Sequence, residues 1–111
     1  MSEKTERIAE LNDKLRTTFN PAAGMVMVTR GFQTLPPDDQ IEILNLIKKF
    51  NDFSKGNNPY GEHDFGAIEK NGNRVFWKID YYNESMTKGS EDPSDPEKTR
   101  RVMTIMLAQE Y

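Results

Sequence analysis

The dipeptide Asn71-Gly72 constrains the fold of this 111-residue chain more than any other feature of its sequence. Asn-Gly favours a tight type I′ turn, and between two apolar segments it is the strongest short-range signal for a β-hairpin. Such segments flank it over residues 62–70 and 74–82, and the second is rich in the β-branched and aromatic residues that favour strands. We therefore expect residues 62–82 to form a hairpin.

A two-residue loop at this position also sets the register of the hairpin, because each residue then faces the one reached by counting outward from the turn. The register is chemically sensible, since it places opposite charges across from each other and a glycine beside the only tryptophan. A slip of one residue remains an alternative. The expected pairs are Glu69 with Arg74, Ile68 with Val75, Gly66 with Trp77, Phe65 with Lys78, and His63 with Asp80.

Apolar residues recur at helical spacing in two further segments and predict helices over residues 3–18 and 37–53. Between them, residues 24–34 contain two Val, two Thr and a Phe and are predicted to form a strand. Both faces of this strand begin with apolar side chains, so we expect it in a central, covered position. Gly31 within it indicates a bulge or a close approach of the backbone.

The C-terminal part begins with a polar loop over residues 83–94, which is long enough to be a binding loop. Residues 94–97 (Ser-Asp-Pro-Glu) then match a helix start, with capping residues, an early proline and a glutamate at the capping-box position. Apolar residues at helical spacing predict that this last helix reaches about residue 109. The residues that share its face are Val102, Ile105, Met106 and Gln109.

The expected order of elements is therefore α-β-α-β-β-α within a single domain of residues 1–111. This order predicts an α+β fold: a small three-stranded, mainly antiparallel sheet, with the hairpin in its C-terminal half, packed against about three helices. Hydrophobic residues make up 35% of the chain, which is enough for one core and leaves a large polar surface.

The composition excludes several classes of protein and narrows the expected partners. There are no cysteines, which excludes disulfides and thiolate metal sites. The net charge is −3 and the basic residues are scattered, so binding to DNA or RNA is not expected and a protein partner fits better. Apolar runs are too short to span a membrane, and the charged N-terminal residues do not resemble a signal peptide. We expect a cytoplasmic protein without a cofactor, since neither a P-loop nor a dinucleotide-binding motif occurs.

The stretch Glu62-His63-Asp64 is the best candidate for a chemical centre, because it places the only histidine between two carboxylates. Strand geometry divides it, since Glu62 and Asp64 would share one face while His63 points to the other. In the expected register His63 instead meets Asp80, and a carboxylate beside an imidazole can set up a general acid or base. No nucleophile is evident nearby, so a hydrogen bond that fixes the end of the hairpin is the simpler interpretation.

Two other interpretations of this region remain open. The histidine together with Glu62, Asp64 and Asp80 could hold a divalent ion, although neither a second histidine nor a ligand spacing supports it. Lys78 and Asp80 could form a charged patch on an otherwise aromatic strand, or simply a solvated sheet face. If the region binds a partner, the contacting residues are expected to be Tyr60, Glu62, His63, Asp64, Lys78, Asp80 and Tyr82.

Three longer motifs resemble a family of small bacterial proteins of unknown function. They are residues 58–66 (Asn-Pro-Tyr-Gly-Glu-His-Asp-Phe-Gly), 76–82 (Phe-Trp-Lys-Ile-Asp-Tyr-Tyr) and 99–111 (Thr-Arg-Arg-Val-Met-Thr-Ile-Met-Leu-Ala-Gln-Glu-Tyr). With Thr29-Arg30-Gly31, the resemblance covers most of the chain from about residue 25 onward. It implies an association with proteobacterial plasmids and other mobile elements, and hence an accessory role such as interference with host defence.

Two function hypotheses from different classes follow. In the first, the protein is a binding module that contacts a protein complex, such as a CRISPR or restriction assembly, and its acidic residues engage surfaces built for nucleic-acid phosphates. In the second, it is a small enzyme or metal-binding protein centred on His63 and Asp80, assisted by Glu62 or Asp64. The two hypotheses differ in whether these four side chains converge in one cleft.

Overall fold

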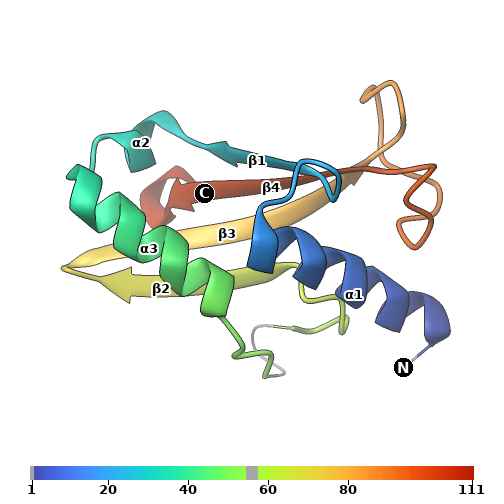
Figure 1. The fold of residues 1–111 in the computed structure, drawn as a ribbon, viewed down its shortest axis with the longest axis horizontal. Coiled ribbons are helices and arrows are strands. Elements are labelled where there is room, and N and C mark those ends of the chain that lie inside the picture. The colour runs from blue at the N-terminus through green and yellow to red at the C-terminus, as the bar shows by residue number, and fades with distance from the viewer. Residues whose placement is uncertain (1, 55–57) are drawn as a thin grey trace.

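A computed structural model describes residues 2–54 and 58–111 and shows a four-stranded mixed sheet with helices packed against it (Figure 1). Its elements are α1 (Glu3–Thr18), β1 (Met25–Val28), α2 (Arg30–Gln33), α3 (Pro37–Lys49), β2 (Phe65–Lys70), β3 (Asn73–Tyr82), β4 (Arg100–Leu107) and the 3₁₀ turn η1 (Ala108–Glu110). The strands lie in the order β1-β4-β3-β2, with β1 parallel to β4 and the other neighbours antiparallel. The fold is α+β as expected, but the described sheet has four strands rather than three.

The hairpin that Asn71-Gly72 predicts is present, and these two residues join β2 to β3. Their φ angles are 53° and 80°, and the type I′ turn requires positive values at both positions. The register is confirmed for the four expected pairs that lie within the strands. The turn signal therefore predicts both the existence of the hairpin and its pairing.

The fifth expected pair, His63 with Asp80, is wrong. β2 begins at Phe65, and the last bond of the ladder before it runs from the Ile79 N–H to the Asp64 carbonyl at 2.8 Å. His63 has a φ angle of 55°, in the left-handed region, so its backbone leaves the extended path and its side chain leaves the hairpin. The expected pair required the extended strand to continue through residues 63 and 64, two residues before β2 begins.

Gly66 lies opposite Trp77, as the register predicts, and the packing there requires a glycine. A Cβ atom on Gly66 would come within 2.7 Å of both Phe50 Cζ and Trp77 Cε2. The indole is fully buried and meets the Phe50 ring edge-on, with 5.4 Å between centroids. The hairpin thus supplies the largest buried side chain among the described residues.

The predicted C-terminal helix is wrong, because this segment forms β4 in the interior of the sheet. Its apolar side chains are buried on both faces, with Met103 and Ile105 in the core and Val102 and Met106 on the opposite face. A strand buried on both faces is a continuous apolar run, so it lacks the alternation that distinguishes a strand from a helix. The β-branched residues Val102, Thr104 and Ile105 are the remaining signal for a strand.

The strand predicted over residues 24–34 is shorter and lies at the edge of the sheet, not at its centre. β1 ends at Val28. Its side chains Met25 and Met27 point away from the core and remain 48% and 51% exposed. β1 thus has apolar side chains on both faces, but only one of these faces is covered.

The chain turns directly from β1 into α2, where the predicted close approach at Gly31 occurs. Thr29 caps the helix by accepting a hydrogen bond from the Phe32 N–H at 3.3 Å. The Glu110 carboxylate accepts from the Gly31 N–H at 3.1 Å, and its Cδ atom would lie 2.5 Å from a Cβ at that position. The C-terminal turn is thereby tied to α2.

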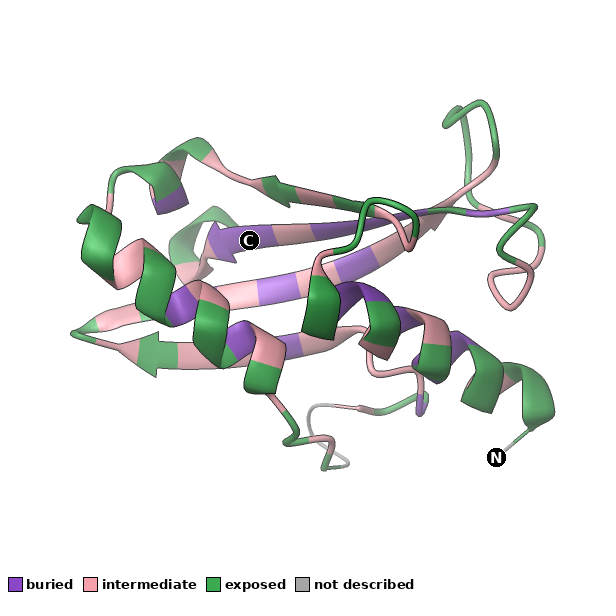
Figure 2. Ribbon diagram, in the orientation of Figure 1, coloured by how far each residue is buried: buried purple, intermediate pink, exposed green. Residues whose placement is uncertain are grey.

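α1 and α3 pack against one face of the sheet and enclose the core (Figures 1 and 2). α1 matches its predicted range, whereas α3 ends at Lys49 rather than at residue 53. Neither of them, nor any other helix in the described ranges, is long and apolar enough to cross a membrane. The buried core consists of Leu15, Phe32, Ile43, Ile47, Val75, Trp77, Ile79, Met103 and Ile105.

The opposite face of the sheet is covered by neither α1 nor α3. Side chains alternate between the two faces of a strand, so the register determines which residues lie there. We call this surface the open face. It is formed by Met25, Met27, Phe65, Ala67, Glu69, Arg74, Phe76, Lys78, Asp80, Tyr82, Arg100, Val102, Thr104 and Met106.

Candidate functional site

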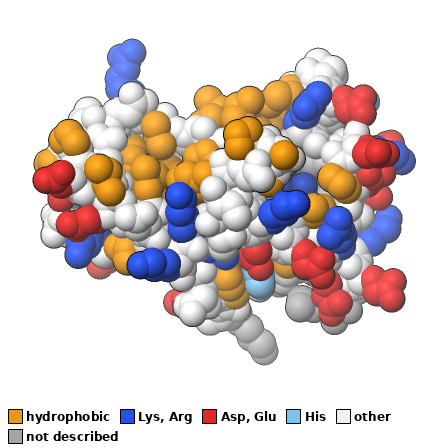
Figure 3. All heavy atoms as spheres, viewed as in Figure 1, with side chains coloured by type: hydrophobic (Ala, Val, Ile, Leu, Met, Phe, Trp, Pro, Cys, Tyr) orange, Lys and Arg blue, Asp and Glu red, His pale blue; other side chains and the backbone are white. Residues whose placement is uncertain are grey.

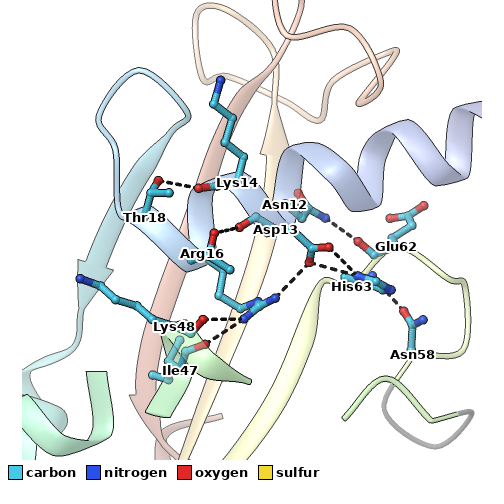
Figure 4. A network of polar contacts seen from close by, with 11 residues as sticks. Asn12, Asp13, Lys14, Arg16, Thr18, Ile47, Lys48, Asn58, Glu62 and His63 are labelled. Atoms are coloured by element: carbon cyan, nitrogen blue, oxygen red, sulfur yellow. Dashed lines mark hydrogen bonds and ion pairs between the residues drawn. The ribbon is translucent and has the colours of Figure 1, made fainter. Parts of the chain in front are cut away.

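The loop before β2 carries several of the predicted site residues, and its backbone turns back toward α1. Gly61 and His63 both have positive φ angles, 74° and 55°. The His63 N–H donates to Asn58 Oδ1 at 2.9 Å, and the imidazole stacks on the Phe53 ring with 3.8 Å between centroids. These contacts fix the ring so that it points toward α1 (Figure 4).

The partner of His63 is Asp13 of α1, and not Asp80 (Figure 4). Nδ1 of the imidazole lies 3.0 Å from each carboxylate oxygen of Asp13. An ionised carboxylate can only accept, so Nδ1 carries the hydrogen. Asp13 Oδ1 also accepts a hydrogen bond from Arg16 Nη2 at 3.1 Å. The carboxylate is therefore shared between an imidazole and a guanidinium.

Arg16 is the member of this cluster that lies in the core. Its side chain is 3% exposed, and Nη1 donates to the Ile47 carbonyl at 3.0 Å near the end of α3. Its Cζ atom lies 5.3 Å from the ring centroids of both Phe53 and Trp77. The cluster of Asp13, Arg16 and His63 thus joins α1, α3 and the loop before β2.

Asn12 is the centre of a second, adjoining set of hydrogen bonds. It is fully buried, and its Nδ2 donates to the Glu62 carbonyl at 2.9 Å and to the Tyr81 hydroxyl oxygen at 2.8 Å. Its Oδ1 accepts from Arg101 Nε at 2.6 Å. The Tyr81 hydroxyl donates to Glu62 Oε1 at 2.8 Å, and burial raises the pKa of Tyr81 far above its usual value. Tyr81 is therefore a neutral hydrogen-bond donor at physiological pH.

The remaining carboxylates divide between two places. Partial burial raises the pKa of Asp64, and the nearby charge of Glu62 raises it further. Asp80 adds a smaller repulsion to Asp64, but its own carboxylate is paired with Lys78 Nζ on the open face. Glu62, His63 and Asp64 thus belong to the loop, whereas Asp80 belongs to the sheet surface.

The other predicted site residues do not join this network. Tyr60 is 76% exposed, and Lys78 and Tyr82 lie on the open face. Across residues 2–54 and 58–111, no three His, Asp or Glu side chains are grouped so that they could hold a metal ion. The enzyme and metal hypotheses centred on His63 and Asp80 therefore have no supporting geometry in these residues.

His63 resembles a general base, because the Asp13 carboxylate orients its imidazole in the way that a carboxylate does in a catalytic dyad. No hydroxyl in the described residues is hydrogen-bonded to the imidazole, however. Most bonds of the network instead join segments that are distant in sequence, apart from those of Asp13 with Arg16 and of Asn58 with His63. The arrangement is suited to holding the loop and the helix ends together.

Sequence reasoning missed the residues of α1 that complete the network. Asn12 and Arg16 are one turn apart and, together with Leu15, belong to the buried side of the helix. Polar residues on the apolar stripe of a helix need buried partners, and this was the available signal. Arg101 was missed for another reason, because its strand was predicted to be a helix.

Comparison with known proteins identifies a family but no relative of known activity. The family model described as protein of unknown function (DUF3768) matches residues 28–110. This range contains β2, β3 and β4 and the loop that carries His63. The chain matches no curated protein and no solved structure.

Proposed function

The chain belongs to this family of proteins of unknown function, and we propose that it acts by binding a protein partner through the open face of its sheet. The observation that carries the proposal is the exposure of Met25 and Met27, at 48% and 51%, on a face that α1 and α3 leave uncovered. Contiguous exposed apolar side chains on a small protein commonly mark an interaction surface. Methionine suits such a surface because its flexible thioether adapts to the partner.

Aromatic side chains form a second apolar patch on the same face, beyond β4, whose Val102 and Met106 are 4% and 5% exposed. Phe65 and Phe76 lie on neighbouring strands with 5.1 Å between their ring centroids. Tyr111 packs edge-on against both rings, at 6.0 Å and 5.6 Å, and remains 76% exposed. Large aromatic side chains that keep an exposed surface are the usual anchors of protein interfaces.

The charges of the open face favour a protein over a nucleic acid. Lys78 and Asp80 pair with each other, and Glu69 lies opposite Arg74. With Arg100 the face holds three basic and two acidic residues, so it lacks the strong positive field of a nucleic-acid surface. A face of Met, Phe, Tyr and Arg with nearly balanced charge matches the composition of protein interfaces.

The proposed partner is a host-defence protein complex, of the restriction or CRISPR type, because this is the context that the family resemblance implies. The proposal is tested by the survival of an incoming plasmid in a host with an active defence system. The protein is expected to raise plasmid survival, and Met27→Glu, which places a charge in the apolar surface, is expected to abolish the effect.

Ile41→Glu is the matched control, because Ile41 is 58% exposed on α3, on the other side of the molecule. It should protect the plasmid as well as the unaltered chain does. Equal activity of the Met27 variant would contradict the open face as the binding surface. Absence of protection against both kinds of defence would contradict the proposed class of partner.

A further inference from the structure

A cavity of about 350 Å³ lies between α1 and the beginning of β4. β1 begins at Met25, opposite Val102, so Arg100 and Arg101 extend past its end and leave this edge of β4 open. Gly24 lets the preceding turn approach β4 closely, since a Cβ there would lie 2.6 Å from the Arg101 carbonyl oxygen. α1 forms the other wall of the cavity.

The lining of this α1–β4 cavity is unusually basic for an acidic chain. Its charged residues are Arg7 and Lys14 from α1 and Arg100 and Arg101 from β4, and no Asp or Glu belongs to the described lining. Leu11 lies between the two basic residues of α1, so all three project from one side of the helix. Figure 3 shows basic side chains gathered along the upper side of α1 and acidic ones along its lower side.

Arg101 is the most deeply buried of these residues, because it is 3% exposed, and its charge interacts with Glu62 without forming a direct ion pair. Nε donates to Asn12 and Nη2 donates to the Pro93 carbonyl, and both of these acceptors are neutral. Within the described ranges it forms no ion pair, and burial lowers the pKa of its guanidinium. These neutral acceptors orient the guanidinium, while its charge is compensated only in part, by the Tyr81 ring at 5.2 Å and by Glu62 without a direct ion pair.

The other basic residues leave the cavity positive as well. Arg7 pairs with Glu10 at 3.2 Å, an exposed contact that solvent screens strongly. Lys14 and Arg100 are exposed and form no ion pair with any residue that the structure describes. Leu11 and Met25 add apolar surface to the same lining. The cavity thus combines an excess of positive charge with an apolar wall.

We propose that the α1–β4 cavity binds a small organic phosphate at the start of β4, with the phosphate between Lys14 and Arg101 on the side of α1 and Arg100 on the side of the open face, and the apolar body against Leu11 and Met25. Several cations around one site favour a doubly charged phosphate over a singly charged carboxylate. Guanidinium groups match phosphate oxygens with paired hydrogen bonds. A cavity of about 350 Å³ is of the size that binds small organic ligands. This site goes beyond the proposed function and is tested without a protein partner, although it shares Met25 and Arg100 with the open face.

Phenyl phosphate is a suitable probe, because it joins a dianion to an apolar ring. Isothermal titration of the full chain should show saturable one-to-one binding that is tighter than that of inorganic phosphate. Because Arg101 is buried and bonded to Asn12, its replacement would test folding as well, so the exposed residues carry the test. Lys14→Ala with Arg100→Ala should weaken binding at least about tenfold, as expected for the loss of two charge-assisted contacts.

Lys49→Ala is the control, since Lys49 is exposed on α3, outside the lining. It should leave the affinity unchanged. The proposal is overturned if phenyl phosphate does not saturate, if the double variant binds as tightly as the control, or if inorganic phosphate binds equally well. Tighter binding of a short phosphotyrosine peptide would overturn the assignment to a free small molecule.

Discussion

The two sides of α1 carry opposite charges and differ in how the fold treats them. Glu3, Glu6, Glu10 and Asp13 follow one another at spacings of three and four residues and form an acidic side. Arg7 and Lys14 form a basic side that continues into Arg100 and Arg101 of β4. Both sides look alike in the sequence, as ordinary charged faces of an exposed helix.

The acidic side is closed by partners within the chain at its C-terminal end, where Asp13 lies. Asp13 is bonded to both His63 and Arg16, and the neighbouring Asn12 holds Glu62 and Tyr81. The basic side instead contains a buried guanidinium without a direct ion pair, beside a cavity whose described lining holds no carboxylate. A cluster with satisfied partners stabilises the fold, whereas an excess of one charge around a cavity indicates a ligand.

The largest expected effect is the loss of stability on removing Asn12. In Asn12→Ala, Arg101 Nε and the Glu62 carbonyl lose a buried partner at once. We expect the free energy of unfolding to fall by about 3 kcal/mol, since each unsatisfied buried polar group costs about 1–3 kcal/mol. Urea denaturation followed by tryptophan fluorescence measures this change. A loss below about 1 kcal/mol would contradict a structural role for the network.

Asp13→Ala removes the partly exposed carboxylate of the network and should reduce the free energy of unfolding by less than Asn12→Ala does. The variant leaves the buried Arg16 without its carboxylate and frees His63, but Asp13 is itself 37% exposed and partly screened by solvent. We expect a loss of about 1–2 kcal/mol in the same denaturation experiment. Glu10→Ala removes an exposed ion pair one turn earlier and should change stability by less than about 0.5 kcal/mol. Equal losses of stability in Asp13→Ala and Glu10→Ala would contradict a greater structural role for Asp13.

Asp64 provides a test that depends on pH. Its pKa is raised in the folded chain by burial and by Glu62, so the folded state binds a proton more readily than the unfolded state. Its contribution to stability is therefore present at low pH and is lost as pH rises from about 4 through the raised pKa. Asp64→Asn should flatten this dependence and slightly stabilise the chain at pH 7. Thermal melts from pH 3.5 to 7.5 compare the two, and a steeper decline in the variant would refute the assignment.

The smallest expected effect on stability is that of Lys14→Ala, on the basic side. Lys14 is exposed and makes no ion pair with a described residue, so the free energy of unfolding should change by less than about 0.5 kcal/mol. Denaturation measured beside that of Asp13→Ala makes the comparison direct, and a loss above about 1 kcal/mol would show that the basic side is structural too.

Local signals predicted much of the fold. Asn71-Gly72 gave the hairpin and its register because turn geometry depends on two adjacent residues. The amphipathic pattern over residues 3–18 gave the bounds of α1 for the same reason. The pattern failed at β4, where burial on both faces removes the alternation, and at Met25, where an apolar side chain is exposed at a sheet edge.

The candidate site could not be predicted from local signals. His63 was paired with Asp80 by extending a strand that ends at Phe65, and a left-handed residue is not visible in the sequence. Its actual partner, Asp13, lies fifty residues away. Arg101 and α1 meet only because β4 lies next to β1 and extends past it, which is a property of the sheet order.

Phosphate binding in the α1–β4 cavity is tested most directly by a map of backbone amide shifts as phenyl phosphate is added to the full chain. If the cavity binds phosphate, the amides near Leu11, Lys14, Arg100 and Arg101 shift together and saturate, while those of residues 58–64 stay in place. Shifts concentrated at residues 58–64, or no saturating shifts along α1 and the start of β4, would contradict it.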